Sequence, residues 1–272
     1  MMSLRTLWVL ASLAIALVLI GATQALAVED PAGGDSANTT GTTETTGATT
    51  EAGAAASQPT FDKDNFHHPL DITNQYMPLE PGTTFVYAGT SGRKHTREGR
   101  KRTREAFVVT DRTKTILDVE TRVIHDTVWE GGKVVESTED WFAQDDAGNV
   151  WYFGEFSTDI ENGKVKGHEG SWEAGVNGAK PGIVMEAHPK VGDTYQQEDA
   201  PGVAEDRATV LSLTESVCVP YGCFSDVLKT REFTPLEPDV VEDKYYAPGV
   251  GQIKEVTVKG GSEESQLVTV VS

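Results

Sequence analysis

The sequence predicts an all-β protein built as a single curled antiparallel meander that closes into a barrel, a half-barrel or a two-layer sandwich. From Thr83 onward no segment shows the helical period, and Gly, Pro and Asn-rich breaks recur about every 8 to 15 residues. Val, Thr, Tyr and Trp dominate between the breaks. About ten strands result, which exceeds what an open twisted sheet usually holds flat, so the sheet should curl.

The first residues have the pattern of a secretory signal peptide, predicted to span residues 1–27. A lone basic residue, Arg5, precedes an apolar run over 7–20, and Ala25-Leu26-Ala27 supplies small residues for cleavage. We therefore expect a secreted or extracytoplasmic protein, in the periplasm or cell wall, without a stable membrane span. An uncleaved anchor is the alternative.

Composition divides the remainder into a spacer and a folded part. Residues 28–60 are rich in Thr, Ala and Gly and nearly free of large apolar side chains, so they predict a disordered spacer. Residues 61–272 are long enough for one all-β domain with a core. The chain has 42 acidic against 23 basic residues and a net charge of −19. This charge argues against nucleic-acid partners and suits cations or cationic partners, although it is also typical of adaptation to salt.

The clearest strand is predicted over Thr115–Trp129. Apolar residues occupy its odd positions, which places them, together with His125, on the inner face, while charged residues at even positions face solvent. Short loops at 130–133 and 144–149 then connect the next strands of a meander. The further strands are expected at 134–143, 150–153, 206–215, 224–234, 240–246, 253–258 and 266–271.

The two cysteines, Cys218 and Cys223, bracket Val-Pro-Tyr-Gly. Pro220 and Gly222 occupy the places that a type I turn prefers, so the two sulfurs should face each other across a hairpin. In an oxidising compartment this arrangement predicts a disulfide. A redox-active pair is the alternative.

Four segments of the folded part carry a resemblance to known proteins. On them the chain resembles a widespread family of uncharacterised secreted or lipoprotein-type bacterial proteins, which implies an extracytoplasmic, β-rich protein and supplies no catalytic residues to carry over. KYYAPGVG also resembles periplasmic carriers whose curved antiparallel sheet holds an apolar ligand. The segments are DWFAQDDAGNVWYFGE (Asp140–Glu155), GSWEAGVNGAKPGIVM (Gly170–Met185), HPKVGDTYQQE (His188–Glu198) and KYYAPGVGQIKE (Lys244–Glu255).

The leading functional hypothesis is a non-enzymatic binding or carrier domain with an aromatic-lined cavity for a small apolar or saccharide ligand. Trp172 and Glu173 lie in a Gly-bounded loop, where an aromatic platform and an acid commonly meet a ligand. No cofactor is predicted, and the oligomeric state is left open. The candidate cavity residues are Trp141, Trp151, Tyr152, Trp172, Glu173, Tyr246 and His125.

Two alternatives remain open. A hydrolase or lyase would use Glu155, Glu173 or His125 in a cleft, although no G-x-S-x-G elbow is present. A metal-binding envelope protein would assemble a site from His125, His168 and His188, or from Asp145 and Asp146 in a turn, although no histidine pair has chelating spacing. The basic segment 93–104 either docks an acidic polymer or is a solvated hairpin tip.

Overall fold

The structure, a computed structural model, describes residues 58–91 and 100–272. The predicted signal peptide, and the predicted spacer up to residue 57, lie outside the described residues. The all-β prediction is confirmed: in the described part the only helical element is a single 3₁₀ turn, η1 (Lys63–Asn65), and strands form nearly everything else.

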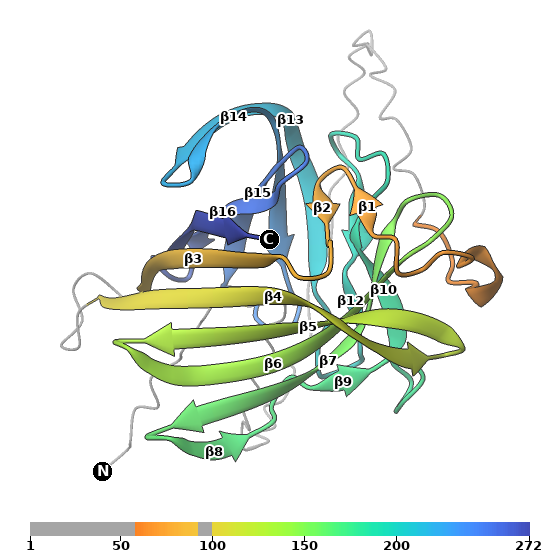
Figure 1. Cartoon of the computed structure of the whole chain (residues 1–272), viewed down its shortest axis with the longest axis horizontal. Coiled ribbons are helices and arrows are strands. Elements are labelled where there is room, and N and C mark those ends of the chain that lie inside the picture. The colour runs from red at the N-terminus through yellow and green to blue at the C-terminus, as the bar shows by residue number, and fades with distance from the viewer. Residues whose placement is uncertain (1–57, 92–99) are drawn as a thin grey trace, which may run out of the picture.

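Most strands belong to one antiparallel sheet that curls into a nearly closed barrel (Figure 1). Its order is β11-β13-β14-β15-β16-β17-β3-β4-β5-β6-β7-β10-β12, and β8 and β9 pair with β7. The two outermost strands, β11 and β12, are consecutive in the chain and separated only by Gln197, so the chain itself passes from one edge of the sheet to the other.

The strands of this sheet are β3 (Thr84–Ser91), β4 (Lys101–Ile116), β5 (Val119–Glu130), β6 (Lys133–Gln144), β7 (Val150–Glu161), β8 (Lys164–Gly167), β9 (Trp172–Glu173), β10 (Lys180–Met185), β11 (Thr194–Gln196), β12 (Glu198–Asp199), β13 (Arg207–Val219), β14 (Gly222–Phe233), β15 (Val241–Ala247), β16 (Gly251–Lys259) and β17 (Glu264–Val271). The meander predicted through the loops at 130–133 and 144–149 is confirmed, as are the later strands, within a few residues at their ends.

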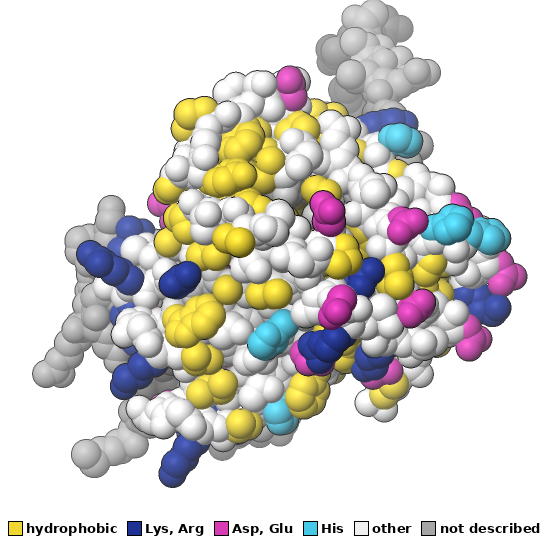
Figure 2. Space-filling view, viewed as in Figure 1, with side chains coloured by type: hydrophobic (Ala, Val, Ile, Leu, Met, Phe, Trp, Pro, Cys, Tyr) yellow, Lys and Arg dark blue, Asp and Glu magenta, His cyan; other side chains and the backbone are white. Residues whose placement is uncertain are grey.

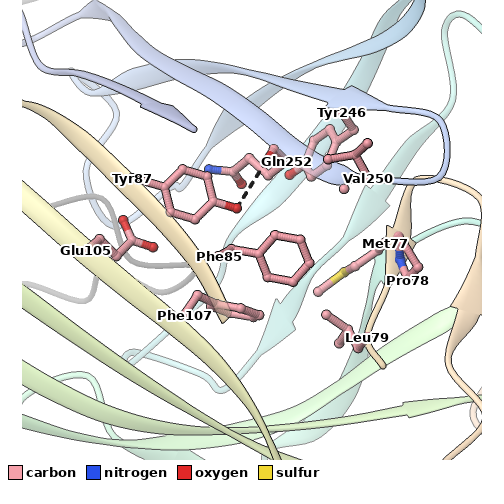
Figure 3. A pocket seen from close by; sticks show the side chains of 11 residues that line it. Met77, Pro78, Leu79, Phe85, Tyr87, Glu105, Phe107, Tyr246, Val250 and Gln252 are labelled. Carbon is pink, nitrogen blue, oxygen red and sulfur yellow. Dashed lines mark hydrogen bonds between the residues drawn. The ribbon is translucent and has the colours of Figure 1, made fainter. Parts of the chain in front are cut away.

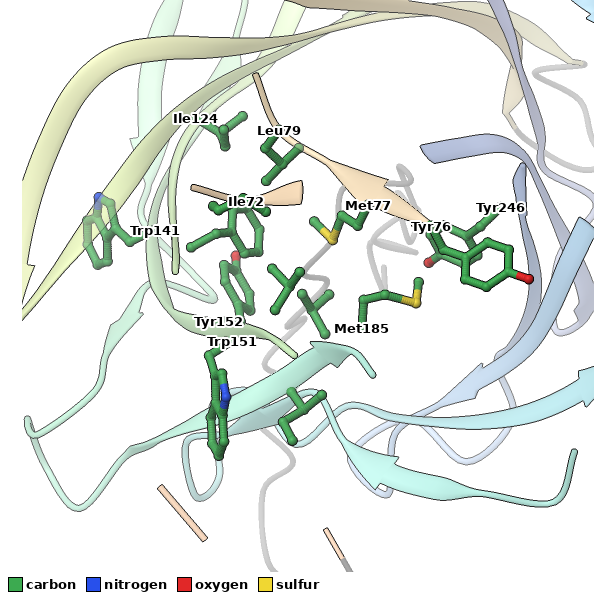
Figure 4. Packing of buried hydrophobic residues seen from close by; sticks show 14 of the residues in the cluster. Ile72, Tyr76, Met77, Leu79, Ile124, Trp141, Trp151, Tyr152, Met185 and Tyr246 are labelled. Carbon is green, nitrogen blue, oxygen red and sulfur yellow. The ribbon is translucent and has the colours of Figure 1, made fainter. Parts of the chain in front are cut away.

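A short hairpin plugs one end of the barrel. It consists of β1 (Thr73–Asn74) and β2 (Met77–Pro78), and its apolar side chains join the interior core with Ile124, Tyr152 and Met185 (Figure 4). Asn74 fixes the hairpin, because its side-chain oxygen accepts from the backbone N–H of Tyr76 at 2.8 Å while its amide donates to the carbonyl oxygens of Gly148 and Glu186 at 2.9 and 3.0 Å. The plug is thereby tied to the neighbouring ends of β7 and β10.

Outside the barrel, the described N-terminal segment packs against β7. The rings of Phe61 and Phe66 contact Trp151 and Phe153, with centroids 5.7 to 6.1 Å apart. Gln58, which lies within the predicted spacer, already exchanges two hydrogen bonds with the backbone of Gln196. The folded part of the chain therefore includes Gln58.

The single strand predicted over Thr115–Trp129 is wrong. β4 ends at Ile116, Leu117 and Asp118 form a turn with φ values of 50° and 63°, and β5 begins at Val119. In β5 the even positions from Ile124 to Glu130 face the interior, which puts His125 on the outer face. The apolar residues at odd positions predicted the wrong inner face because Val123 is buried although it lies on the outer face. It packs there against its cross-strand neighbour Trp141.

The predicted disulfide is confirmed. Cys218 and Cys223 lie opposite each other in the β13–β14 hairpin and are bonded, with their Cα atoms 4.0 Å apart. The hairpin turns at Pro220 and Tyr221, and Tyr221 is exposed at its tip. On the face shown in Figure 2, hydrophobic side chains gather over this hairpin and the neighbouring strands.

Candidate functional site

The interior of the barrel has two chemically different ends. On several strands the inward-facing residues change from apolar to acidic along the strand: Ile124 precedes Asp126 in β5, and Ile253 precedes Glu255 in β16. In β15 the order is reversed, as the antiparallel direction requires, with Glu242 and Lys244 before Tyr246. One end is therefore an apolar core with the plug, and the other is a layer of carboxyl groups.

This acidic layer is unusual because its carboxyl groups are enclosed by protein. Lys244 is a fully enclosed cation within it, 2.7 Å from Glu232 and 3.8 Å from Glu255. Burial raises the pKa of Asp126, Glu155 and Glu255 well above the ordinary value, and neighbouring carboxyl groups raise it further. The layer comprises Glu105, Asp126, Glu136, Asp140, Glu155, Glu198, Asp206, Glu232, Glu242 and Glu255.

A pocket opens where the two ends meet (Figure 3). Its cavity volume is about 30 Å³, room for two or three waters. The plug forms one wall, β3 and β4 form the second, and the β15–β16 turn forms the third. The lining residues are Met77, Pro78, Leu79, Phe85, Tyr87, Glu105, Phe107, Tyr246, Val250, Gly251 and Gln252.

Local sequence patterns bring these side chains to the pocket. Phe85 and Tyr87 alternate on β3 and lie directly opposite Phe107 and Glu105 on β4, so all four project from the same face. The rings of Phe85 and Phe107 pack edge to face at 6.2 Å. Gly251 adopts a φ of 107° at the start of β16, a conformation that glycine tolerates, and this turns the chain past Pro78.

The polar groups of the pocket lie at its inner side. The Tyr87 hydroxyl donates to the backbone oxygen of Gln252 at 3.0 Å, and the Gln252 amide donates to Glu255 at 3.4 Å. The side-chain oxygen of Gln252 is buried and accepts no hydrogen bond from the described residues. Glu105 is half-buried as a residue, but its carboxyl group is enclosed, and burial raises its pKa to about 8.

Two of the predicted aromatic residues, Tyr152 and Trp172, do come together inside the barrel, with their rings edge to face at 5.4 Å. The Tyr152 hydroxyl donates to Asp140 at 2.6 Å and lies 3.3 Å from Glu155, and burial raises the pKa of Asp140 to about 7. The Trp172 indole donates to Glu198 at 3.4 Å. These groups pack together within the interior.

A β-bulge makes this cluster. Tyr152 and Glu155 are three residues apart and would face opposite sides of a regular strand, but the register of β7 shifts between them and both face inward. Gly154 has a φ of 121°, and a Cβ there would lie 2.2 Å from the backbone oxygen of Trp172. Only glycine allows this close approach of β9.

The other predicted aromatic residues lie elsewhere. Trp141 projects from the outer face, where the Lys114 ammonium sits 3.3 Å from its ring centroid and 2.8 Å from Glu173. Trp151 packs under the N-terminal segment and donates to Asp145 at 2.8 Å. Of the seven candidate cavity residues, only Tyr246 lines the pocket.

The residues named for hydrolysis are not brought together. Glu155 is 2% exposed and faces the interior, whereas Glu173 pairs opposite Gly154 and faces outward. His125 lies on the outer face of β5, 3.1 Å from the Ser137 hydroxyl.

The residues named for metal binding have other partners. Asp145 accepts from Asn149 and Trp151, Asp146 pairs with His67 at 2.5 Å, and His168 lies 2.8 Å from the backbone oxygen of Ser157. Across residues 58–91 and 100–272, no group of three His, Cys, Asp or Glu side chains, His188 included, is placed to hold a metal ion.

Part of the basic segment 93–104 lies outside the described residues, which resume at Arg100. There Arg100 donates to the backbone oxygen of Ser262 at 2.5 Å and Lys101 pairs with Glu130 at 3.0 Å. Arg102 and Arg104 are exposed on β4. Two of the described basic residues of this segment therefore contact residues of the same domain.

Sequence reasoning missed most of the pocket. Phe85, Tyr87 and Phe107 were not among the candidates, although the alternation Phe85-x-Tyr87 and Glu105-x-Phe107 on neighbouring strands contains the signal. The two strands are adjacent in sequence, so their facing residues could have been paired. The contribution of the plug, Met77 to Leu79, has no such local signal.

Comparison with known proteins gives distant similarities only. No family model matches the chain, and no curated protein matches it. A "putative exported protein with YmcC-like fold" from Bacteroides fragilis NCTC 9343 is 14% identical, with a TM-score of 0.41 over 73% of this chain and 100% of its own. A "putative lipoprotein" from Parabacteroides distasonis ATCC 8503 is 12% identical, with a TM-score of 0.39 over 73% of this chain and 99% of its own. Similarity this distant supports no function for the chain.

The described residues contain no helix of the length and hydrophobicity needed to cross a membrane.

Proposed function

We propose that this chain is a non-enzymatic, extracytoplasmic binding protein that holds a small, mainly apolar ligand in the pocket between the plug and β3, β4 and the β15–β16 turn. The observation that carries the proposal is the pocket itself: apolar walls with a few polar groups at one side are the usual form of a small-molecule site.

The lining favours an apolar ligand over a saccharide. A sugar needs several donors and acceptors along its edge, whereas the pocket offers the Glu105 carboxyl and the Gln252 side-chain oxygen among mostly apolar side chains. The small enclosed volume limits the buried part to a few heavy atoms, so the rest of the ligand would lie at the mouth beside Val250 and Pro78.

Two features support an extracytoplasmic location. The N-terminal sequence has the signal-peptide pattern, and the Cys218–Cys223 disulfide is a bond that oxidising compartments preserve. The spacer predicted over 28–60 would hold the barrel away from a wall or membrane surface.

Native mass spectrometry of the protein purified from its natural source tests the binding role. We expect a bound molecule in the wild type and its loss in Val250→Trp, because an indole at this position fills the mouth of the pocket. Val258→Trp, on the same strand pair but exposed, is the matched control and should keep the molecule. Equal retention in both variants would place the ligand elsewhere.

A further inference from the structure

The walls of the pocket are unusually rich in aromatic rings. Phe85 and Tyr87 come from β3, Phe107 from β4 and Tyr246 from β15, and all four line the pocket together with Met77. In Figure 3 the Phe85 ring lies in the middle of the view, between Tyr87, Phe107 and Met77. The face of an aromatic ring carries negative electrostatic potential and attracts a cation within about 6 Å of its centre. Four such rings can therefore attract a cation in addition to contacting apolar groups.

The hydrogen-bond donors of these side chains are already engaged. The Tyr87 hydroxyl donates to the Gln252 backbone oxygen at 3.0 Å, and the Tyr246 hydroxyl donates to Glu232 at 3.1 Å. The Gln252 amide donates to Glu255 at 3.4 Å. The two tyrosine hydroxyls are thus unavailable to an anion, and the Gln252 amide would offer it one remaining N–H.

One acceptor, in contrast, remains available. The side-chain oxygen of Gln252 is buried and has no hydrogen-bond partner among the described residues. The Glu105 carboxyl, the one acid among the residues that line this pocket, is hydrogen-bonded to Asp126. Rings, an orphan amide oxygen and a carboxyl group together are the surroundings that suit a positive charge on an apolar body.

Resting on the function proposed above, we infer that the ligand of this pocket is a small organic cation, an ammonium group carrying methyl or other short alkyl substituents. The aromatic faces of Phe85, Tyr87, Phe107 and Tyr246 contact the alkyl groups, and the Glu105 carboxylate balances the charge. The net charge of −19 raises the local concentration of such cations around the protein.

Binding of the cation is coupled to release of a proton from Glu105. Because the enclosed carboxyl group has a pKa of about 8, it is largely protonated at pH 7 in the empty pocket. A bound cation favours the carboxylate, so the proton passes to solvent and the affinity rises with pH up to about 8. The charged and titratable groups that face Glu105 are Tyr87 of β3, Asp126 of β5, Glu136 and Asp140 of β6, Lys244 of β15 and Glu255 of β16.

A pair of probes of equal shape tests the inference. Choline and 3,3-dimethylbutan-1-ol differ only in that a quaternary nitrogen replaces a quaternary carbon, so their affinities separate the charge from the apolar contact. With the purified, disulfide-bonded protein at pH 8, we expect titration calorimetry to show choline binding at least about tenfold more tightly than the alcohol. Lowering the pH to 6 should weaken choline binding and leave the alcohol unchanged.

A matched pair of variants locates the charge. Glu105→Gln should weaken choline binding at least about tenfold at pH 8 without affecting the alcohol, and it should abolish the pH dependence. Glu120→Gln changes the net charge equally at an exposed position of β5 and should bind like the wild type. Choline affinity of Glu105→Gln within twofold of the wild type would overturn the assignment of the carboxylate.

The outcomes distinguish this inference from the function on which it rests. Equal affinity of the wild type for both probes would overturn the inference that the ligand is a cation. The proposal that the pocket binds a small apolar ligand would remain. Binding of neither probe also overturns it, and the Val250→Trp comparison then decides separately whether the pocket holds any ligand. The probe pair needs no substitution, so the test stands even if Glu105→Gln does not fold.

Discussion

The two ends of the barrel interior are built on the same strands but are stabilised differently. At the plugged end, Phe142 and Ile124 are fully buried in the apolar core, while Tyr152, which stacks on Phe142 with centroids 4.6 Å apart, extends its hydroxyl to Asp140 of the acidic layer. At the other end, Glu232 and Glu255 surround Lys244, and all three are nearly inaccessible to solvent. Transfer of rings out of water stabilises the first end at any pH, whereas the second must bury ionisable groups.

The difference shows where the fold depends on solution conditions. Burying a carboxylate costs far more than burying a ring of similar size, and a protein reduces that cost by keeping the group protonated or by pairing it. Here both occur: Glu105 and Asp140 are held towards the protonated form, and Glu232 is paired with Lys244. The contribution of the apolar end to stability should therefore be independent of pH, whereas the contribution of the acidic end should change with pH.

The largest expected effect is on the stability of the whole protein as pH changes. Burial raises the pKa of Glu105 from 4.5 to about 8 and that of Asp140 from 3.8 to about 7, so between about pH 4 and 8 the folded state binds more protons than the unfolded state. The free energy of unfolding should then fall with rising pH, by about 1.4 kcal/mol per pH unit for each such proton. Urea unfolding at pH 5, 6.5 and 8 measures this, and a flat or rising profile would contradict an enclosed acidic layer.

The second-largest expected effect is the loss of stability caused by Phe142→Ala at the apolar end. Phe142 is fully buried, so truncation leaves a cavity and removes the stacking contact with Tyr152, at an expected cost of about 3–5 kcal/mol. The loss should be the same at pH 5 and pH 8 in urea unfolding. Val258→Ala, exposed on β16, should cost less than about 0.5 kcal/mol. A strong pH dependence of the Phe142→Ala loss would mean that the two ends are coupled.

Lys244→Met makes the corresponding change at the acidic end. Burial alone would lower the pKa of Lys244, but Glu232 and Glu255 outweigh it and raise the pKa well above its ordinary value, so the ammonium is charged across the working range. Its removal should cost about 3 kcal/mol at pH 8, where the carboxyl groups lose their cation, and less at pH 5, where protons replace it. Lys254→Met removes a partly exposed pair with Glu264 and should cost at most about 1 kcal/mol at either pH. Equal losses for the two variants would show that the interior ion pair is solvated.

Much of the fold could be predicted from the sequence, because strand lengths, turns and the disulfide depend on local residues. The Glu130–Lys133 turn and the Cys218–Cys223 hairpin are examples. The acidic layer could not be predicted, because a Glu or Asp at alternate positions of a strand ordinarily indicates the face exposed to solvent. No local feature of the sequence marks these acidic residues as interior. Asp126 was assigned to solvent for this reason, and His125 to the core.

The candidate site was predicted only in part for a similar reason. Trp151 and Tyr152 are neighbours in one strand and therefore face opposite sides, so a cavity lined by both was excluded by the pleat. Tyr246 lines the pocket, but its partners Met77 and Leu79 come from a plug more than 150 residues away in the chain. Only the tertiary closure of the barrel brings these segments together.

The smallest expected effect concerns His125, and it tests which face of β5 is the inner one. His125 lies on the outer face, half-buried, with one hydrogen bond of 3.1 Å to the Ser137 hydroxyl, whereas its neighbour Asp126 is enclosed in the acidic layer. Because Ser137 is itself half-buried and can turn to water, His125→Ala should cost only about 0.5–1 kcal/mol and should not affect ligand retention. Ser137→Ala should cost a similar amount, and the double variant should cost less than the sum, since both single changes remove the same bond. Urea unfolding and native mass spectrometry on the three variants give both quantities. A loss above about 2 kcal/mol for His125→Ala, or loss of a bound molecule, would place His125 inside the barrel and Asp126 outside, and would reverse the division of the interior on which the comparison of the two ends depends.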